Sequence, residues 1–193
     1  SGCRRTISDP HPEGAVVMKF TETNLSGVYI VELERNEDER GWFARAWCRE
    51  EFVVNGLPSD LVQCNLSHNA QRGTLRGLHF QIAPYSETKL VRCVAGAAYD
   101  MALDLRPDSP TFKQSFAAEL SAANGVALFI PQGFAHGFQT LVDNTTLFYQ
   151  MSVPYTPEAV DGVRWNDFAF NLEWPIADPI VCVRDSTFPD FIS

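Results

Sequence analysis

The chain has 193 residues, of which 45% are hydrophobic, and its formal net charge is −9. This length and composition predict a globular protein with a single core rather than a disordered chain. The negative charge argues against nucleic-acid binding, which depends on a basic face that neutralises phosphates. Because the sequence also has no uninterrupted apolar run of the ~18 residues that span a membrane, we expect a cytoplasmic protein that binds neither nucleic acid nor membranes.

The first patterned segment begins at Met18. Residues 1–17 mix Arg, Pro, His and Gly without periodicity and without the hydrophobic core of a signal peptide, so we interpret them as a flexible N-terminal extension. Residues 18–193 are predicted to form one domain. The sequence has five cysteines, and they are widely spaced without a C-x-x-C pair, which predicts reduced thiols rather than disulfides or a zinc site.

Short segments with alternating apolar and polar residues, separated by turn residues, follow one another along the rest of the chain. They predict a mostly β protein, and their spacing favours a sandwich or jelly roll over βαβ units. The expected strands are, in chain order, residues 27–33, 42–46, 61–67, 74–81, 90–95, 97–105, 114–120, 127–130, 137–141 and 146–153. Residues 36–41 are expected to form a turn, 49–55 a short helix and 157–160 a helical turn.

Ionisable residues gather on strands that are expected to contribute to the core. They are Arg76, His79, Lys89, Arg92, Asp100 and Asp104, followed by His136 and Tyr149 on later segments. A buried charge without a partner is costly, so the cluster indicates a pocket. For any one of these residues, a polar network inside a barrel is the alternative interpretation.

Strand alternation constrains which of these residues can share a site. Arg76 and His79 are three residues apart, so a regular strand directs them to opposite faces. Gly77 lies between them and permits a bulge that would bring both to one face. Asp100 and Asp104 share a face with Ala102, so at least one of the two carboxylates is expected to face polar partners or solvent.

The residue types indicate proton chemistry more than metal or phosphate-loop chemistry. His79 and His136 stand alone instead of in an H-x-H pair, although two histidines on separate strands could still join a carboxylate around a metal. The sequence lacks the glycine-rich phosphate loop, the dinucleotide fingerprint and the G-x-S-x-G motif. Proton abstraction beside a carbonyl needs a base, an acid and a cation at the enolate oxygen, and His, Tyr and Lys fit these roles.

Several segments carry a family resemblance over about residues 18–185. They read DERG, TLRGLHFQ, KLVR, AYDMALDLRPDSPTF, ELSAANG, IPQGFAHGFQTL, LFYQMSVPYTPE and GVRWNDFAFNLEWP. In order and spacing, the chain resembles the dTDP-4-dehydrorhamnose 3,5-epimerase family. The resemblance implies a cupin-type jelly-roll homodimer that epimerises a nucleotide-linked 4-keto-6-deoxyhexose, a precursor of polysaccharide or antibiotic sugars, without a metal or an organic cofactor.

The resemblance also implies roles for individual residues. The catalytic base falls on His79, the acid on Tyr149, the enolate-stabilising cation on Lys89 and the carboxylate partner of the base on Asp185. A second set is implied to bind the substrate: Arg76 and His136 in the pocket, Tyr155 at the nucleotide side, Gln63 and Asn65 on a substrate-facing strand, and Arg40 reaching the diphosphate across the dimer. Arg45 is expected near the nucleotide end, where it could join Arg40 and Arg76.

Two departures from the family leave the exact reaction open. Arg45 stands where family members carry an acidic residue, and residues 82–88 read IAPYSET instead of a glycine-containing loop. The first affects recognition of the nucleotide or sugar, and the second affects which carbon faces the base. We expect inversion at both C3 and C5. The alternatives are a single-centre 3- or 5-epimerase on another nucleotide sugar, a non-catalytic cupin-like sugar-binding module, and a metal-dependent dioxygenase or isomerase.

Overall fold

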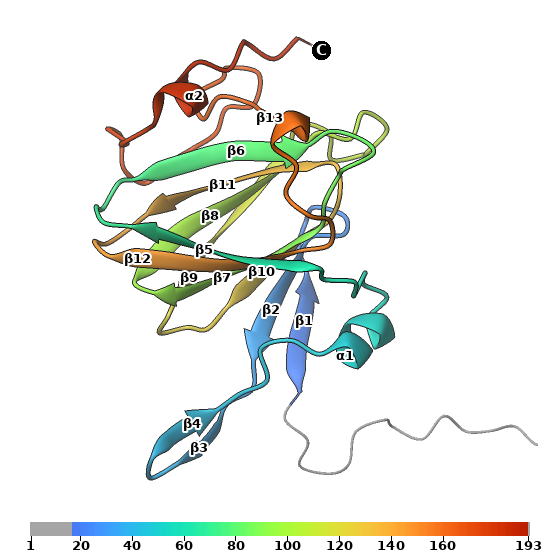
Figure 1. The fold of residues 1–193 in the computed structure, drawn as a ribbon, viewed down its shortest axis with the longest axis vertical. Coiled ribbons are helices and arrows are strands. Elements are labelled where there is room, and N and C mark those ends of the chain that lie inside the picture. The colour runs from blue at the N-terminus through green and yellow to red at the C-terminus, as the bar shows by residue number, and fades with distance from the viewer. Residues whose placement is uncertain (1–16, 193) are drawn as a thin grey trace, which may run out of the picture.

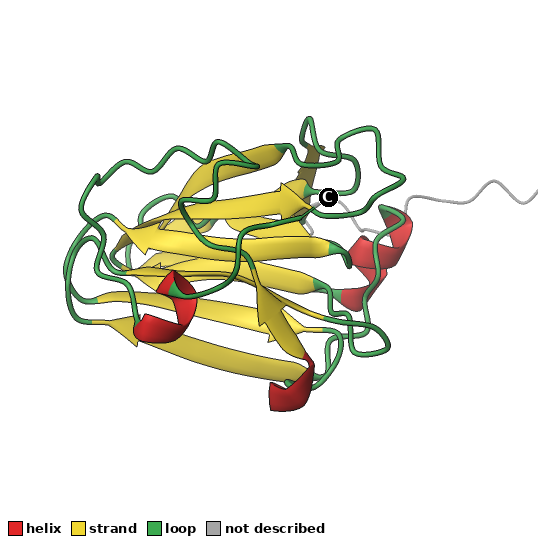
Figure 2. Cartoon of the chain, turned by 90° about the horizontal axis from the view of Figure 1, so that it is seen from above, coloured by secondary structure: helices red, strands yellow, loops and turns green. Residues whose placement is uncertain are grey.

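Two antiparallel β-sheets pack face to face in the computed structural model, which describes residues 17–192 (Figures 1 and 2). The six-stranded sheet has the order β1-β2-β10-β7-β12-β5, and the five-stranded sheet has the order β13-β6-β11-β8-β9. The predicted cupin-type jelly roll is therefore confirmed. The predicted N-terminal extension lies outside the described residues, except for Val17.

The strands of both sheets are short. Those of the six-stranded sheet are β1 (Met18–Glu22), β2 (Tyr29–Leu33), β10 (Ala127–Ile130), β7 (Lys89–Ala95), β12 (Thr145–Met151) and β5 (Gln63–Asn69). Those of the five-stranded sheet are β13 (Val160–Gly162), β6 (Leu75–Gln81), β11 (Phe134–Thr140), β8 (Ala97–Asp104) and β9 (Ser115–Ser121). The helical segments are α1 (Arg49–Val54), the 3₁₀ turn η1 (Pro157–Ala159) and α2 (Val183–Ser186).

Most of the expected elements are present, and the differences have local causes. The turn predicted at residues 36–41 is present only at Glu39 and Arg40, because the flanking residues belong to a hairpin of β3 (Asn36–Asp38) and β4 (Gly41–Phe43) that points away from the two sheets (Figure 1). Its strands are exposed throughout, so no buried face produces an alternating pattern. No sequence pattern indicated β13 or α2, because they span only three and four residues, too few to show a period.

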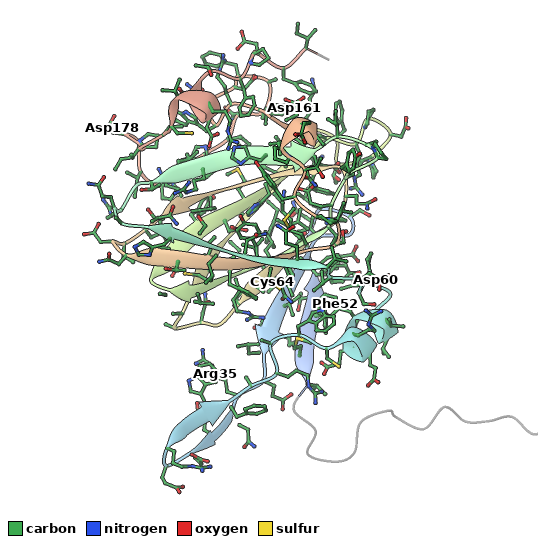
Figure 3. The ribbon with its side chains drawn as sticks, in the orientation of Figure 1. Arg35, Phe52, Asp60, Cys64, Asp161 and Asp178 are labelled. Atoms are coloured by element: carbon green, nitrogen blue, oxygen red, sulfur yellow. The ribbon has the colours of Figure 1, made fainter. Side chains whose placement is uncertain are left out.

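The core consists of three apolar layers. The central layer lies between the sheets and includes Val91, Leu147, Phe134 and Phe138. A second layer lies under α1, where Phe52 is fully buried against Val31 and Phe129 (Figure 3). The third lies between the five-stranded sheet and the C-terminal segment, which contributes residues such as Val163, Phe170 and Trp174. The C-terminal segment is therefore held against the back of the sheet that contains β6.

Asp100 and Asp104 are both fully buried, and both have polar partners, as the strand pattern required of at least one. Asp104 accepts hydrogen bonds from Arg106, Ser109 and Thr111 in the turn after β8. Burial raises the pKa of Asp104, but these donors outweigh it and hold the pKa at about 2. The carboxylate therefore stays ionised and fixes the turn.

Helix length and the state of the cysteines can also be compared with the sequence predictions. Between residues 17 and 192, no helix is long and apolar enough to cross a membrane. The four cysteines within this range, Cys48, Cys64, Cys93 and Cys182, are free thiols. Cys64 and Cys93 lie on strands β5 and β7, as predicted.

A bulge in β6 brings Arg76 and His79 to the same side of the sheet. On β11, His136 pairs with His79 but Phe138 pairs with Arg76, so β6 has one residue more than β11 between these two pairs. Gly77 lies at the bulge with φ +117, and a Cβ there would come within 2.6 Å of Gly137 Cα. Only glycine fits both the conformation and the space. The bulge that Gly77 was expected to permit is therefore present.

The bulge generates a prediction for Gly77→Ala. The positive φ alone costs about 1–3 kcal/mol in a residue with a Cβ, and the contact with the Gly137 backbone adds to this cost. Gly56→Ala is the matched control, because Gly56 has φ +73 but a Cβ added there would meet nothing within 4 Å. Urea unfolding should show a clearly larger loss of stability for Gly77→Ala. Equal losses would mean that the close approach of β6 and β11 is not a constraint.

Candidate active site

A cavity of about 240 Å³ lies between the two sheets. Strands β6 and β11 form one wall and β5, β7 and β12 form the other, while Tyr155, Val160 and Arg184 lie at the rim from later segments. The lining residues are Ser67, Arg76, His79, Phe80, Gln81, Glu87, Lys89, His136, Phe138, Tyr149, Met151, Tyr155, Val160 and Arg184. Six of these were predicted as site residues from the sequence: Arg76, His79, Lys89, His136, Tyr149 and Tyr155.

His79 is held by a buried carboxylate from a distant part of the chain. Its Nε2 lies 2.8 Å from Asp185 Oδ1, and Asp185 is only 1% exposed. The other oxygen of Asp185 accepts the backbone N–H of Gly77 at 2.9 Å. Asp185 therefore satisfies the N–H at the bulge and orients the imidazole two residues further along β6.

The contacts of His79 Nε2 determine its tautomer. Arg184 Nη2 lies 3.1 Å from the same nitrogen, but Nε2 cannot both accept from Arg184 and donate to Asp185. We assign the proton to Nε2, because the buried carboxylate needs donors and a lone pair facing it would be repelled. The remaining ring nitrogen, Nδ1, then carries the lone pair and is the basic atom of His79.

Asp185 is an anion at neutral pH despite its burial. Burial raises its pKa, but the hydrogen bonds from His79, the Gly77 backbone and Arg184 together hold the pKa well below its ordinary value. Arg184 Nε contacts Asp185 Oδ1 at 3.1 Å. A carboxylate held in this way can stabilise a positive charge on His79 when the ring accepts a proton.

Lys89 begins β7, on the sheet opposite His79, and its side chain reaches into the cavity. Its ammonium lies 2.5 Å from Glu87 Oε1 and donates to the backbone oxygen of His79 at 3.2 Å. Lys89 is 8% exposed and Glu87 7%. Lys89 is therefore a buried residue of the cavity and not a solvated residue at the edge of the sheet.

Tyr149 lies on β12, also on the sheet opposite His79. Burial raises the pKa of its hydroxyl, with a smaller opposing effect of Arg76. The phenol is therefore protonated at neutral pH and is available as a proton donor. Since β6 and β12 belong to different sheets, His79 and Tyr149 face the cavity from two sides.

His136 forms a second histidine–carboxylate pair beside the first. Its Nε2 lies 2.9 Å from Oδ1 of the fully buried Asp100, and His136 is the cross-strand neighbour of His79. Each imidazole thus has its own carboxylate. Within residues 17–192 there is no group of three or more His, Cys, Asp or Glu side chains arranged to hold a metal ion.

The remaining predicted binding residues divide into a group beside the cavity and a group away from it. Arg76 and Tyr155 line the cavity. Gln63 accepts the backbone N–H of Tyr155 at 3.0 Å and donates to Asn65 at 3.0 Å. Gln63 therefore holds the backbone of Tyr155, and neither Gln63 nor Asn65 lines the cavity.

Arg40 and Arg45 do not converge with Arg76 within one chain. Arg40 lies on the β3–β4 hairpin with its side chain 82% exposed, and within residues 17–192 it pairs only with Asp38. Arg45 contacts Glu51 of α1 at 2.5 Å. Because Glu51 holds the guanidinium of Arg45 at α1, Arg45 does not reach the cavity of its own chain.

Two charged residues of the cavity were missed from the sequence. Glu87 precedes Lys89 by two positions, and residues two apart on an extended segment share a face, so their pairing could have been predicted. Arg184 is the second residue of α2. This helix has four residues and is too short to show a periodic pattern. The exposed Arg184 lines the cavity beside His79.

A histidine–carboxylate pair, a lysine ammonium and a tyrosine around one cavity of a jelly roll define the class of protein. They are the groups of an acid–base enzyme that moves protons beside a carbonyl.

Comparisons with known proteins identify the family. A sequence model of the dTDP-4-dehydrorhamnose 3,5-epimerase family matches residues 22–192. A dTDP-4-dehydrorhamnose 3,5-epimerase of Sinorhizobium fredii is 40% identical over 173 residues, which make up 89% of each chain. The crystal structure of the Bacillus anthracis enzyme of that name, with TDP and PPi bound, has a TM-score of 0.88 at 40% identity and covers 91% of this chain and 100% of its own.

The chain belongs to the dTDP-4-dehydrorhamnose 3,5-epimerase family of isomerases, as its sequence segments indicated. The same fold also occurs in ChmJ, a 3'-monoepimerase from Streptomyces bikiniensis in complex with dTDP-quinovose, with a TM-score of 0.81 at 29% identity over 87% of this chain and 85% of that one. Membership of the fold therefore does not determine the number of carbons that are inverted.

The depressed pKa of Asp185 generates a prediction for Asp185→Asn. A carboxylate whose pKa is lower in the folded state contributes stability above its unfolded pKa, about 3.9, and loses it as the pH falls further. The variant should be less stable than the wild type at pH 7, and the difference should shrink between about pH 4 and pH 2. Urea unfolding at several pH values measures it.

Asp178→Asn is the control for this comparison, because Asp178 is exposed in the same C-terminal segment (Figure 3). Its stability should follow the wild-type pH curve. If Asp185→Asn also runs parallel to the wild type at every pH, Asp185 is not the stabilising anion described above.

Proposed function

We propose that this chain inverts C3 and C5 of a nucleotide-linked 4-keto-6-deoxyhexose, converting a dTDP-4-dehydro-6-deoxyglucose type of sugar to the dTDP-4-dehydrorhamnose type. The observation that carries the proposal is that His79 with Asp185, Lys89 and Tyr149 surround one cavity in a member of this epimerase family. Each inversion removes a proton beside the C4 ketone and returns a proton to the opposite face of the same carbon.

His79 is the proposed base. The C–H bond beside the ketone breaks, the proton goes to Nδ1 of His79, and the electron pair moves into an enolate with its charge on the C4 oxygen. Asp185, 2.8 Å from Nε2, stabilises the resulting imidazolium and keeps the ring from rotating. Solvent removes the extra proton from His79 after the step.

Lys89 is the proposed donor to the enolate oxygen. Positioned donors in a site that excludes water stabilise developing oxyanion charge, and loss of one such donor lowers kcat by about 10²–10³. Support for this role comes from the burial of the ammonium and its place in the cavity lining.

Tyr149 is the proposed acid. Its hydroxyl gives a proton to the carbon from the face opposite His79 and later regains one from solvent, so the overall reaction is an isomerisation without a net change in composition. Support comes from the location of His79 and Tyr149 on different sheets and from the burial that keeps the phenol protonated.

A homodimer is part of the proposal because Arg40 is remote from the cavity of its own chain. The outer face of the six-stranded sheet exposes Leu66 and Val94, 68% and 47% respectively, and the hairpin exposes Phe43, 69%. An apolar face of this kind is typical of a contact between chains. A second copy would cover it and bring Arg40 to the diphosphate. Sedimentation as a monomer would contradict this part. The cytoplasmic location stays an expectation from the sequence.

A single-centre epimerase is the second candidate. The observations that favour keeping it are the structural similarity to a 3'-monoepimerase and the unusual loop at residues 82–88, which borders the cavity through Glu87. The two candidates share the base, the acid and the cation. They differ in whether one or two carbons of the sugar exchange protons with solvent.

The test uses dTDP-4-keto-6-deoxyglucose in heavy water, with proton NMR of each carbon and a 4-keto reductase to draw off the product. The wild type should incorporate deuterium at C3 and C5, whereas a single-centre enzyme should label one carbon. Tyr149→Phe should still incorporate deuterium, because His79 can remove a proton and return a solvent-derived one to the same face. Net inversion should be lost.

The phenylalanine ring preserves the packing, and the melting temperature of Tyr149→Phe checks this. A structural role for the hydroxyl would lower stability, exchange and inversion together. Inversion at the wild-type rate in the variant would exclude Tyr149 as the acid, and a wild type without deuterium incorporation would exclude the epimerase itself.

A further inference from the structure

Glu87 is the only carboxylate among the described residues that line the cavity. It lies in the loop between β6 and β7, is 7% exposed, and uses both of its oxygens. Oε1 lies 2.5 Å from Lys89 Nζ, and Oε2 accepts the backbone N–H of Gln81 at 3.0 Å. The proposed mechanism assigns this buried anion no role.

A carboxylate is unfavourable in a cavity that binds a diphosphate and forms an enolate, because like charges repel. A buried carboxylate is also costly unless a cation and hydrogen-bond donors compensate it. The cation beside Glu87 is Lys89, and no other lysine or arginine forms an ion pair with it in residues 17–192. The function of Glu87 is therefore to be sought in what it does to Lys89.

The ammonium of Lys89 has three N–H groups. One is directed to Glu87 and another to the backbone oxygen of His79, which leaves one for a ligand in the cavity. Because the two fixed acceptors come from different segments, the loop before β7 and strand β6, they hold the ammonium at one position.

We propose that Glu87 is a positioning residue that keeps Lys89 charged and directs its free N–H into the cavity. This inference rests on the proposed function of the site. Glu87 does not touch the sugar, and it acts only through Lys89.

Two opposing effects decide whether a carboxylate helps at this position. Glu87 weakens the field of Lys89 at the enolate oxygen, which by itself would slow the reaction. However, desolvation drives a buried amine toward its neutral form by up to ~3–5 pH units, and an adjacent carboxylate reverses ~1–3 units of this effect. A neutral amine would lose the charge that stabilises the enolate, so retention of the proton outweighs the weaker field.

The other ionisable groups around Lys89 do not replace Glu87. They line the cavity from β6, β11, β12, the segment after β12 and α2, and they are Arg76, His79, His136, Tyr149, Tyr155 and Arg184. None of them is an anion at neutral pH. The carboxylates of Asp100 and Asp185 lie behind the two histidines. Glu87→Gln therefore removes the one negative charge in contact with the ammonium.

The sequence offers a direct readout of this effect, because it has only three lysines, at positions 19, 89 and 113. In the full chain labelled with ¹³C at lysine Cε, each lysine gives one signal that moves when its amine loses a proton. Lys89→Met assigns the Lys89 signal. In Glu87→Gln, the Lys89 signal should titrate at a lower pH than in the wild type, while the Lys19 and Lys113 signals should stay where they are in the wild type.

Glu158→Gln is the matched control: the chemical change is the same, but Glu158 is exposed on η1 and absent from the cavity lining. The Lys89 titration should be unchanged in this variant. The dependence of kcat on pH is measured in parallel, and only Glu87→Gln should move its basic limb to lower pH. A structural role for Glu87 would instead lower the melting temperature without moving the Lys89 titration.

Glu87→Asp keeps the charge at a shorter reach and covers the case in which Glu87→Gln does not fold. Its Lys89 signal should titrate below the wild type by a smaller amount, with a lower kcat at neutral pH. A wild-type Lys89 titration in folded Glu87→Gln would overturn the inference, and so would a wild-type titration together with a wild-type kcat in Glu87→Asp. Failure of the proposed function is a separate outcome, recognised by a wild-type enzyme that incorporates no deuterium at C3 or C5.

Discussion

The buried carboxylate of Asp185 is the constraint on which the geometry of the site depends. It joins the C-terminal segment to β6 through two hydrogen bonds, one from the Gly77 backbone and one from His79. The bulge at Gly77 frees a buried N–H that would be costly without a partner. Asp185 satisfies this N–H and, with its other oxygen, fixes the imidazole that the bulge has brought to the same side as Arg76.

The anionic and cationic side chains of the site lie at different depths around the cavity. Asp100 and Asp185 are buried behind His136 and His79, whereas the ammonium of Lys89 and the guanidinium groups of Arg76 and Arg184 line the cavity. This layout lets a protein with a net charge of −9 present a cationic surface to an anionic ligand. Glu87 is the exception, and its contact with Lys89 explains its presence.

Much of the fold followed from the sequence, because alternating strands and Gly- or Asn-containing turns are local signals. The site followed only in part. Strand alternation placed Arg76 and His79 on opposite faces, and Gly77 could only permit the bulge that unites them. Asp185 could be paired with His79 through the family resemblance alone, since no local pattern links residues so far apart. The location of Arg40 and Arg45 outside the cavity depends on tertiary structure, which a single sequence does not show.

The most direct test of the Asp185–His79 constraint is the side-chain tautomer of His79. The sequence has four histidines, so ¹⁵N NMR of the imidazole nitrogens is resolvable, and His79→Asn assigns the signals of interest. At a pH where the ring is neutral, the predicted result is a proton on Nε2, donated to Asp185, and a bare Nδ1. A proton on Nδ1 with a bare Nε2 would mean that Arg184, and not Asp185, holds the ring, and would contradict the assignment of His79 as a base oriented by Asp185.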